Sequence, residues 1–271
     1  MVNLKKMISA TLKCGLGNMM FIISASSALA WDNNDSAVYN FDDYTTIPHR
    51  PPQDYRETIF RKLKLSDKTK KFPEYLYHDA PYKQIPYSNP LRIHGYFQSE
   101  KYFKNYSNRI KSMFESTSDI KNTIANKYQD ILKGTTVSMH VRRGDYLALP
   151  DEHPVLKKEY YYRALELMPP INHILIFSDD VGWCKENLNF SINSTIIEED
   201  DILSMYLMAE CDHNIIANST FSWWGAWLNS NNEKTVVTPE EWYGPAITNE
   251  GGDKKKCDDL LPISWIKLRG F

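Results

Sequence analysis

The sequence lacks several features that would assign it to a specialised class of protein. Among its 271 residues there is no run of about eighteen apolar residues, so the sequence predicts no membrane-spanning helix. The formal net charge is only −2, which leaves no overall basic field to attract nucleic acid. Internal repeats and low-complexity tracts are also absent. We therefore expect a globular protein without a nucleic-acid partner.

Cysteine is scarce, and its spacing follows no pattern. The four cysteines lie far apart in the chain: Cys14, Cys184, Cys211 and Cys257. This spacing matches neither a disulfide framework nor a set of metal ligands. A reducing compartment, the cytoplasm, is therefore the expected location. Peripheral attachment to a membrane stays open, because it needs no spanning helix.

What the sequence does contain is enough for a folded core. Hydrophobic residues make up 42% of the chain and charged residues 24%, as in soluble domains. After Gly134, short apolar runs alternate with helical patterns as far as Val237, which predicts a parallel, doubly wound α/β sheet. Gly134 also ends a helix expected over 120–132. We therefore expect one domain over 1–133 and a second over 134–271.

The first ninety residues are less regular. Residues 1–30 have the outline of a secretory signal cleaved after Ala30, but serines dilute the apolar stretch and a Gly-X-Gly pair lies within it. We favour a structural strand–turn–helix unit, with its turn at 15–18. Residues 32–90 are rich in proline and tyrosine, which predicts irregular structure with a short helix over 56–65.

The segment 137–146 reads VSMHVRRGDY and joins a buried strand to two adjacent arginines. Arg142 and Arg143 would lie at the carboxyl edge of a parallel sheet, where ligands bind in open α/β folds. Because arginine recognises phosphate with two parallel hydrogen bonds, we interpret the segment as an anion site for a nucleotide pyrophosphate. Two alternatives stay open: a pair of solvated charges, and an Arg-Gly-Asp adhesion ligand at 143–145.

A second segment, 214–229, reads NIIANSTFSWWGAWLN and joins a strand to an aromatic helix. Asn218, Ser219 and Thr220 are typical N-cap residues, and the amides of a helix start bind anions. Plain capping accounts for these residues equally well. With Arg142 on another strand of the same sheet, however, the two segments can converge on one pyrophosphate.

Paired carboxylates and tryptophans complete the pattern. Asp179 and Asp180 end a third strand, and we expect them to cap the helix that begins near Trp183. Contact with a ribose or with a loop backbone is the alternative for these two residues. The tryptophans of the aromatic helix are expected to pack against the sheet.

Together these segments resemble the α-1,2-fucosyltransferases of glycosyltransferase family 11. The resemblance rests on five stretches in the family's order: CGLGNMMF, HGYFQSEKYF, HVRRGDY, FSDD and IIANSTFSWWGAWLN. It implies a GT-B architecture, in which two Rossmann-like domains face a cleft. It also implies transfer of L-fucose from GDP-fucose, with inversion, to the 2-hydroxyl of a galactose on a glycan or lipid-linked oligosaccharide. Neither a metal nor another cofactor would be needed.

The same resemblance implies roles for individual residues. Arg142 would bind the donor pyrophosphate and stabilise the leaving group, with His140 beside it. Arg143 and Asp145 would organise the loop. The other donor-binding residues come from the start of the aromatic helix and from the glycine loop near the N-terminus: Asn218, Ser219, Thr220, Ser222, Gly15, Gly17 and Asn18. No carboxylate stands out by its spacing as the general base.

Three positions depart from the family pattern. Cys14 stands where the family has glycine, Met19 where it has glutamine, and Ser204 where it has aspartate. These departures leave a second hypothesis open, the same fold with a different nucleotide sugar. A third hypothesis is a secreted adhesion or lectin-like module, which takes Ala30 as a cleavage site and 143–145 as the ligand.

Overall fold

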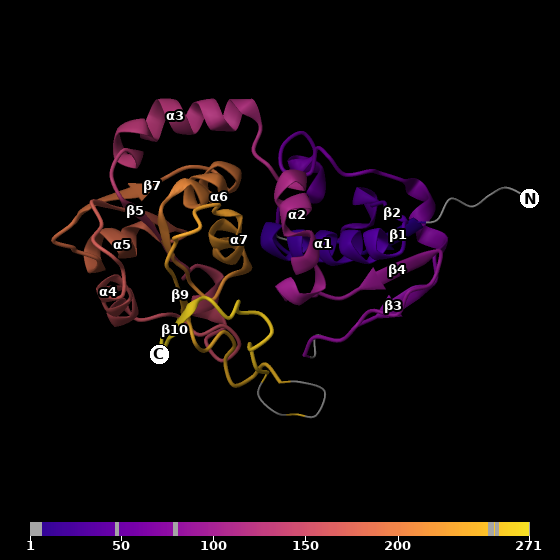
Figure 1. Cartoon of the computed structure of the whole chain (residues 1–271). Coiled ribbons are helices and arrows are strands. Elements are labelled where there is room, and N and C mark those ends of the chain that lie inside the picture. The colour runs from indigo at the N-terminus through magenta and orange to yellow at the C-terminus, as the bar shows by residue number, and fades with distance from the viewer. Residues whose placement is uncertain (1–6, 47–48, 78–80, 249–251, 253–254, 271) are drawn as a thin grey trace, which may run out of the picture. The chain divides into compact units, whose positions relative to one another are not determined.

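The computed structural model describes residues 7–46, 49–77, 81–248, 252 and 255–270. The chain forms two compact units, which we call unit 1 and unit 2. Unit 1 comprises Met1–Glu115 and Asp258–Leu260, and unit 2 comprises Ser116–Cys257 and Leu261–Phe271. Each unit is an α/β structure built on its own parallel sheet (Figure 1), as the sequence predicts. The division differs from the expected boundary at 133/134 by one helix, which packs within unit 2.

The sheet of unit 1 has four parallel strands in the order β2-β1-β4-β3. They are β1 (Met7–Ala10), β2 (Ser36–Ala37), β3 (Glu74–Leu76) and β4 (Leu91–His94). Helix α1 (Leu16–Asp32) follows β1, which confirms the strand–turn–helix unit near the N-terminus. Strands β2 and β3 lie in the part expected to be irregular. They were not predicted, because elements of two and three residues are too short to show an alternating pattern.

Helix α1 is buried along most of its length, serines included. Ser26 Oγ donates to the backbone oxygen of Ile22 at 2.8 Å. Ser26 and Ser27 also share hydrogen bonds of 2.9 Å with the Tyr39 hydroxyl. A buried hydroxyl with a partner costs little free energy, so the serines that dilute the apolar stretch are compatible with a place in the core.

Short helical turns make up most of the rest of unit 1. They are η1 (Phe41–Asp43), η2 (Pro52–Tyr55), η3 (Asp67–Lys71), η4 (Glu100–Tyr102) and η5 (Lys104–Tyr106), followed by α2 (Ser107–Met113). The helix expected over 56–65 is wrong, because residues 56–62 form turns. The rings of Tyr55, Phe60 and Phe114 pack against one another there, so tertiary packing overrides the local helical pattern.

The sheet of unit 2 has six parallel strands in the order β10-β9-β8-β5-β6-β7. The strands are β5 (Thr136–Val141), β6 (His173–Ser178), β7 (Asn193–Ile197), β8 (His213–Ile215), β9 (Val236–Pro239) and β10 (Ile266–Leu268). The helices are α3 (Ser118–Leu132), α4 (Lys158–Glu166), α5 (Val181–Asn187), α6 (Asp201–Glu210) and α7 (Thr220–Leu228), with the turn η6 (Asp145–Ala148).

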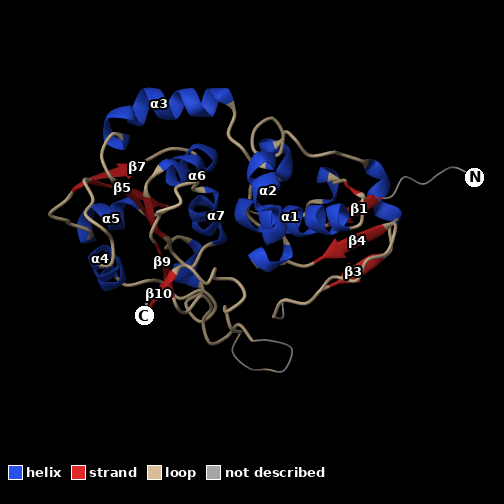
Figure 2. Cartoon of the chain, viewed as in Figure 1, coloured by secondary structure: helices blue, strands red, loops and turns tan. Residues whose placement is uncertain are grey.

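The alternation of strands and helices expected after Gly134 is confirmed from β5 to β9. Figure 2 shows α4 and α5 on one side of the six-stranded sheet and α6 and α7 on the other, which is the doubly wound arrangement. Trp223 and Trp224 of α7 are fully buried, and the Trp223 ring lies against those of Trp227 and Trp265; packing against the sheet stays a prediction. Strand β10 was not expected, because three residues are too few to identify a strand by alternation.

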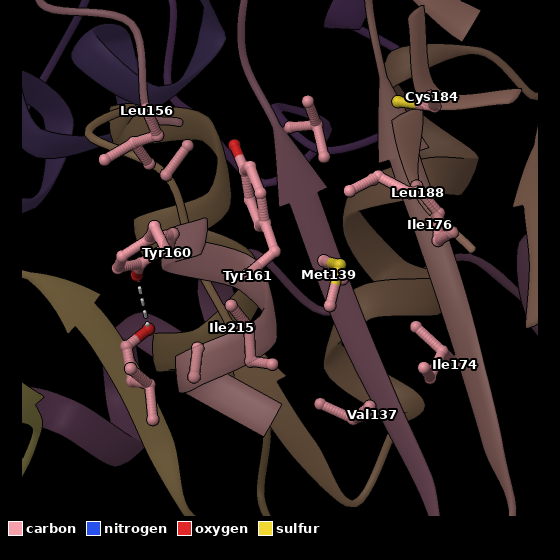
Figure 3. Close-up of a cluster of buried hydrophobic side chains, with 14 residues drawn as sticks. Val137, Met139, Leu156, Tyr160, Tyr161, Ile174, Ile176, Cys184, Leu188 and Ile215 are labelled. Carbon is pink, nitrogen blue, oxygen red and sulfur yellow. Dashed lines mark hydrogen bonds between the residues drawn. The ribbon is translucent and has the colours of Figure 1, made fainter. Parts of the chain in front are cut away.

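The central strand β5 is anchored by a hydrophobic core that it shares with α4 (Figure 3). Val137, Met139 and Val141 alternate along β5 and point into this core. Tyr160 and Tyr161 of α4 are both fully buried in it. The core therefore fixes the position of β5, and with it the loop that leaves the carboxyl end of this strand.

Each sheet reverses its direction of growth at one point. In unit 2 the chain runs from β5 outward to β6 and β7, and then returns to β8 on the other side of β5. In unit 1 it runs from β1 to β2 on one side, and β3 and β4 follow on the other side of β1. Ligands of open α/β sheets bind at the carboxyl ends of strands at such a switch point. The points lie between β5 and β8 in unit 2 and between β1 and β4 in unit 1.

The two adjacent tyrosines of α4 provide a test of this core. The Tyr160 hydroxyl donates to Ile216 O at 2.7 Å and reaches Val237 O at 3.5 Å (the dashed line in Figure 3). The Tyr161 hydroxyl is buried without a hydrogen-bond partner among the described residues. We expect Tyr160→Phe to lower the free energy of unfolding by about 1–2 kcal/mol, and Tyr161→Phe to leave it unchanged or raise it. Denaturant titration measures both; an equal loss in the two variants would contradict the assignment.

Candidate functional site

The loop after β5 holds Arg142 between two carboxylates. Its Nη2 lies 2.6 Å from Asp145 Oδ1, and its Nη1 lies 2.9 Å from Asp179 Oδ2. The guanidinium also lies over the Tyr146 ring, 5.3 Å from the ring centroid. Because about a quarter of the side chain is exposed, 28%, the structure presents a fixed, partly accessible positive charge at the switch point of unit 2.

Arg143 points in another direction and is packed more tightly. Its Nε donates to Asp180 Oδ2 at 3.0 Å, and its guanidinium lies 4.2 Å from the centroid of the Trp183 ring. Only 16% of its side chain is exposed. An adhesion ligand needs its arginine free at a loop tip, so this packing is unfavourable to the Arg-Gly-Asp interpretation.

Asp179 and Asp180 do more than cap a helix. Asp180 Oδ1 does accept the expected N-cap bond from Trp183 N, at 3.0 Å. Asp179 Oδ1 accepts a bond from the backbone N–H of Arg143 at 2.9 Å, the loop contact that we gave as an alternative. The ion pairs to both arginines were not expected. A signal for them existed: β5 and β6 are parallel neighbours that pair Val141 with Ser178, so the residues that follow the two strands must meet.

Gly144 is needed for a contact within the protein. A Cβ at this position would lie 2.5 Å from Asp179 Oδ2, and that oxygen is held by Arg142. A glycine in such a loop can permit a tight turn or the close approach of another group. What approaches its backbone is the carboxylate of Asp179.

The start of α7 differs from the expected capping arrangement. Ser219 is the N-cap residue, but its side chain makes no capping hydrogen bond. Asn218 is 1% exposed and points inward, where its Nδ2 donates to Pro154 O at 3.0 Å and Trp242 O at 3.2 Å. Side-chain capping by these residues is therefore wrong. Asn218 shapes the loop from within, and the backbone amides of the first turn are left to face an anion.

Two hydrogen bonds bring the Arg142 loop and the start of α7 together. His140 Nδ1 lies 2.9 Å from Ser222 Oγ, and the Tyr146 hydroxyl donates to Asn218 O at 2.8 Å. His140 and Ser222 are both buried. The two segments thus lie together, held by the side chains of His140, Ser222 and Tyr146 and by the backbone oxygen of Asn218; that they bind one pyrophosphate stays a prediction.

His140 is neutral in this setting. Burial lowers its pKa from 6.5 to about 3, and the nearby positive charge of Arg142 acts in the same direction. A neutral imidazole adds no positive charge to an anion site. His140 therefore contributes the hydrogen bond that links β5 to α7.

The glycine loop expected in the N-terminal domain lies at the switch point of unit 1. Gly15 is the N-cap of α1, and Gly17 and Asn18 belong to the first turn of this helix. Asn18 Oδ1 accepts a hydrogen bond from Gln98 Nε2 at 2.7 Å. Gln98 was not among the expected site residues, although it lies within the HGYFQSEKYF stretch.

The three departures from the family pattern have simple structural settings. Cys14 has φ = +60°, a conformation that favours glycine, so the usual glycine at this position matches the backbone. Met19 is fully buried in unit 1, and Ser204 is 8% exposed on α6. The Ser204 hydroxyl donates to Glu199 O at 3.3 Å. The last two departures are therefore at core positions.

The described part of the chain offers neither a cluster of metal ligands nor a membrane-spanning helix. There, no group of three or more His, Cys, Asp or Glu side chains is arranged to hold a metal ion. All four cysteines are present as free thiols. None of the helices within the described ranges has the length and apolar character needed to cross a membrane.

Comparison with known proteins places these features in a family. The model of Glycosyl transferase family 11 matches residues 2–267. The O-antigen biosynthesis glycosyltransferase WbnK of Escherichia coli is 32% identical over 68% of this chain, and an alpha-1,2-colitosyltransferase of Escherichia coli is 29% identical over 64%. The matches span 63% and 61% of those two relatives. A galactoside 2-alpha-L-fucosyltransferase of Caenorhabditis elegans is 27% identical over 97% of this chain and 79% of its own length.

Solved structures show the same fold. The fucosyltransferase NodZ from Bradyrhizobium matches with a TM-score of 0.58 at 12% identity, over 82% of this chain and 92% of that one. A NodZ alpha-1,6-fucosyltransferase soaked with GDP-fucose matches with a TM-score of 0.51 at 15% identity, over 83% and 92% of the two chains. The expected GT-B class of α/β fold, with parallel sheets, is confirmed.

The buried His140 should make stability depend on pH. Its folded-state pKa lies below the unfolded value of 6.5, so the unfolded chain takes up the proton first and stability falls as the pH drops from 6.5 toward 3. We expect His140→Gln to flatten the dependence of the unfolding free energy by up to about 1.4 kcal/mol per pH unit in this window. Urea titrations between pH 7 and 4.5 measure the slope.

The exposed residue His49 supplies the control for that experiment. His49→Gln should leave the wild-type slope unchanged, because the substitution removes no buried imidazole. An identical slope in His140→Gln and wild type would show that His140 does not resist protonation in the folded state.

Proposed function

The chain belongs to glycosyl transferase family 11, and we propose that it transfers L-fucose from GDP-fucose to the 2-hydroxyl of a galactose residue, with inversion at the anomeric carbon. The acceptor would be a glycan, free or lipid-linked, and a lipid-linked one would bring the enzyme to a membrane surface. The proposal rests on one observation in unit 2: Arg142 and the first turn of α7 are joined at the switch point by the His140–Ser222 and Tyr146–Asn218 hydrogen bonds.

This arrangement suits the chemistry of sugar transfer. Breaking the bond between fucose and phosphate leaves negative charge on the departing GDP, while the sugar becomes oxocarbenium-like and develops positive charge. A fixed guanidinium and the amides of a helix start can stabilise that leaving group without reorganising. We propose that Arg142 supplies the charge and that no metal is required for this step.

The linkage has stronger support than the sugar. The colitosyltransferase and the worm fucosyltransferase are both named for transfer to a 2-position, yet they differ in the sugar that they transfer. A second candidate function is therefore the same α-1,2 transfer with a different deoxysugar nucleotide. It is favoured by the 29% identity to the colitosyltransferase.

Charge at the site indicates how the donor enters. Arg142 and Arg143 face three carboxylates, those of Asp145, Asp179 and Asp180. A diphosphate on Arg142 would meet these carboxylates as like charges, so its binding is favoured when it replaces one of them. We propose that it replaces Asp145, which is 52% exposed and, among the described residues, has no second contact comparable to the Asp179 bond to Arg143 N.

The first test is binding of nucleoside diphosphates to the purified protein in EDTA. We expect GDP to bind at least about tenfold more tightly than UDP or ADP, and Arg142→Lys to lose most of that affinity, because a point charge cannot replace the planar guanidinium. Calorimetry measures the affinities. Turnover with GDP-fucose and a galactoside should fall by about 100-fold or more in Arg142→Lys.

Three outcomes of this test would contradict the proposal. Equal binding of all nucleoside diphosphates would contradict GDP-fucose as the donor. Near-normal turnover in Arg142→Lys would show that the arginine does not stabilise the leaving group. Transfer to a 2-deoxygalactoside would show that the 2-hydroxyl is not the acceptor group. Preference for another deoxysugar nucleotide over GDP-fucose would select the second candidate function.

A matched pair of neutralising substitutions tests donor entry. Asp145→Asn and Asp179→Asn remove the same charge from the same guanidinium. We expect Asp145→Asn to bind GDP several-fold more tightly, since its carboxylate competes with phosphate. Asp179→Asn should bind GDP about tenfold less tightly, since Arg142 loses its fixed partner. Tighter binding in both variants would show that only the net charge matters.

A further inference from the structure

A pair of carboxamides occupies the switch point of unit 1. Asn18 lies in the first turn of α1, just after β1, and Gln98 lies in the loop just after β4. Strands β1 and β4 are hydrogen-bonded neighbours, and the hydrogen bond from Gln98 Nε2 to Asn18 Oδ1 joins the two loops at 2.7 Å. The pair therefore lies where ligands of open parallel sheets bind.

Both loops contain a backbone conformation that is unfavourable for an ordinary residue. Cys14 has φ = +60° and Phe97 has φ = +51°. Of the described residues other than glycine, only these two and Asn34 have positive φ. Such positions cost of the order of 1–3 kcal/mol each and occur mainly at functional sites. They immediately precede the Gly15 turn and Gln98.

Packing holds both conformations in place. Phe97 is fully buried, stacked on Tyr77 with ring centroids 5.2 Å apart and in edge contact with Tyr102. The Tyr44 hydroxyl donates to Cys14 O at 2.9 Å. The two loops are therefore rigid supports, and the carboxamides that they carry have defined positions.

We propose that Gln98 is a positioning residue that orients the carboxamide of Asn18 toward a sugar bound at the switch point of unit 1. By donating to Oδ1, Gln98 turns the Nδ2 group of Asn18 away from itself, so that this group can donate to a hydroxyl oxygen of the sugar. The inference rests on the proposed function and on the donor contact that family resemblance implies for Asn18. It adds the residue that sets the direction of that contact.

The decisive variants are Gln98→Leu and Gln98→Glu. Leucine removes the hydrogen bond. Glutamate keeps a bond between the two side chains but reverses it, because a carboxylate can only accept, and so turns Asn18 Oδ1 outward. We expect both variants to lower kcat for fucosyl transfer by about 10–100-fold, with the melting temperature and the GDP affinity unchanged.

Two controls separate orientation from folding. Asn33→Leu removes a hydrogen bond of similar length, 2.8 Å from Asn33 Nδ2 to Leu29 O, at the other end of α1, and should leave kcat unchanged. In an Asn18→Ala background, both Gln98 substitutions should have no further effect, because coupled residues are not additive.

Each other result overturns the inference. Wild-type turnover in Gln98→Glu would show that a hydrogen bond of either direction to Asn18 is sufficient. The role of Gln98 would then be structural. Additive effects in the Asn18→Ala background would show that Gln98 acts independently of Asn18. Failure of the proposed function is distinguishable, because it appears in the wild-type protein as absent GDP binding or absent fucosyl transfer.

Discussion

The carboxylate of Asp179 connects the parts of the site in unit 2. One oxygen lies 2.9 Å from Arg142 Nη1 and the other accepts the backbone N–H of Arg143 at the same distance. A single side chain at the end of β6 thus fixes both the charge and the backbone of the loop after β5. Gly144 has no side chain because this carboxylate occupies the space. Without the pair, Arg142 would be one of many surface arginines whose position carries little information.

Buried hydrogen bonds hold Arg142 and the start of α7 in position. His140 and Ser222 link β5 to α7, and Tyr146 links the Arg142 loop to Asn218. None of these side chains needs to touch a ligand to be essential, because each determines the distance between the guanidinium and the helix start. In a site that works by preorganised charge, a small displacement of either part reduces its effect. The residues expected to bind the donor therefore divide into two sets. One set presents charge or backbone amides to the ligand, and the other holds those groups in position.

Units 1 and 2 place their polar groups by the same rule. Both sheets are parallel, and in both the polar loops follow the two strands at the point where strand order reverses. Unit 2 presents charge there, whereas unit 1 presents a pair of carboxamides on strained loops. Fixed charge suits the phosphates of a nucleotide, whereas carboxamides suit neutral oxygens such as sugar hydroxyls.

The sequence alone determined the fold class, the elements from β5 to β9 and the two loops that meet at Arg142, because these depend on hydrophobic period and on strand order. It also indicated a turn before the first helix, but placed it at 15–18, whereas the helix already begins at Leu16. Tertiary structure alone decided which polar side chains turn inward. Asn218 has the character of a helix cap in the sequence and Ser222 that of a donor-binding hydroxyl, but the packing of α7 buries both. Gln98 carries no local signal, because its partner is 80 residues away and only the pairing of β1 with β4 brings the two together.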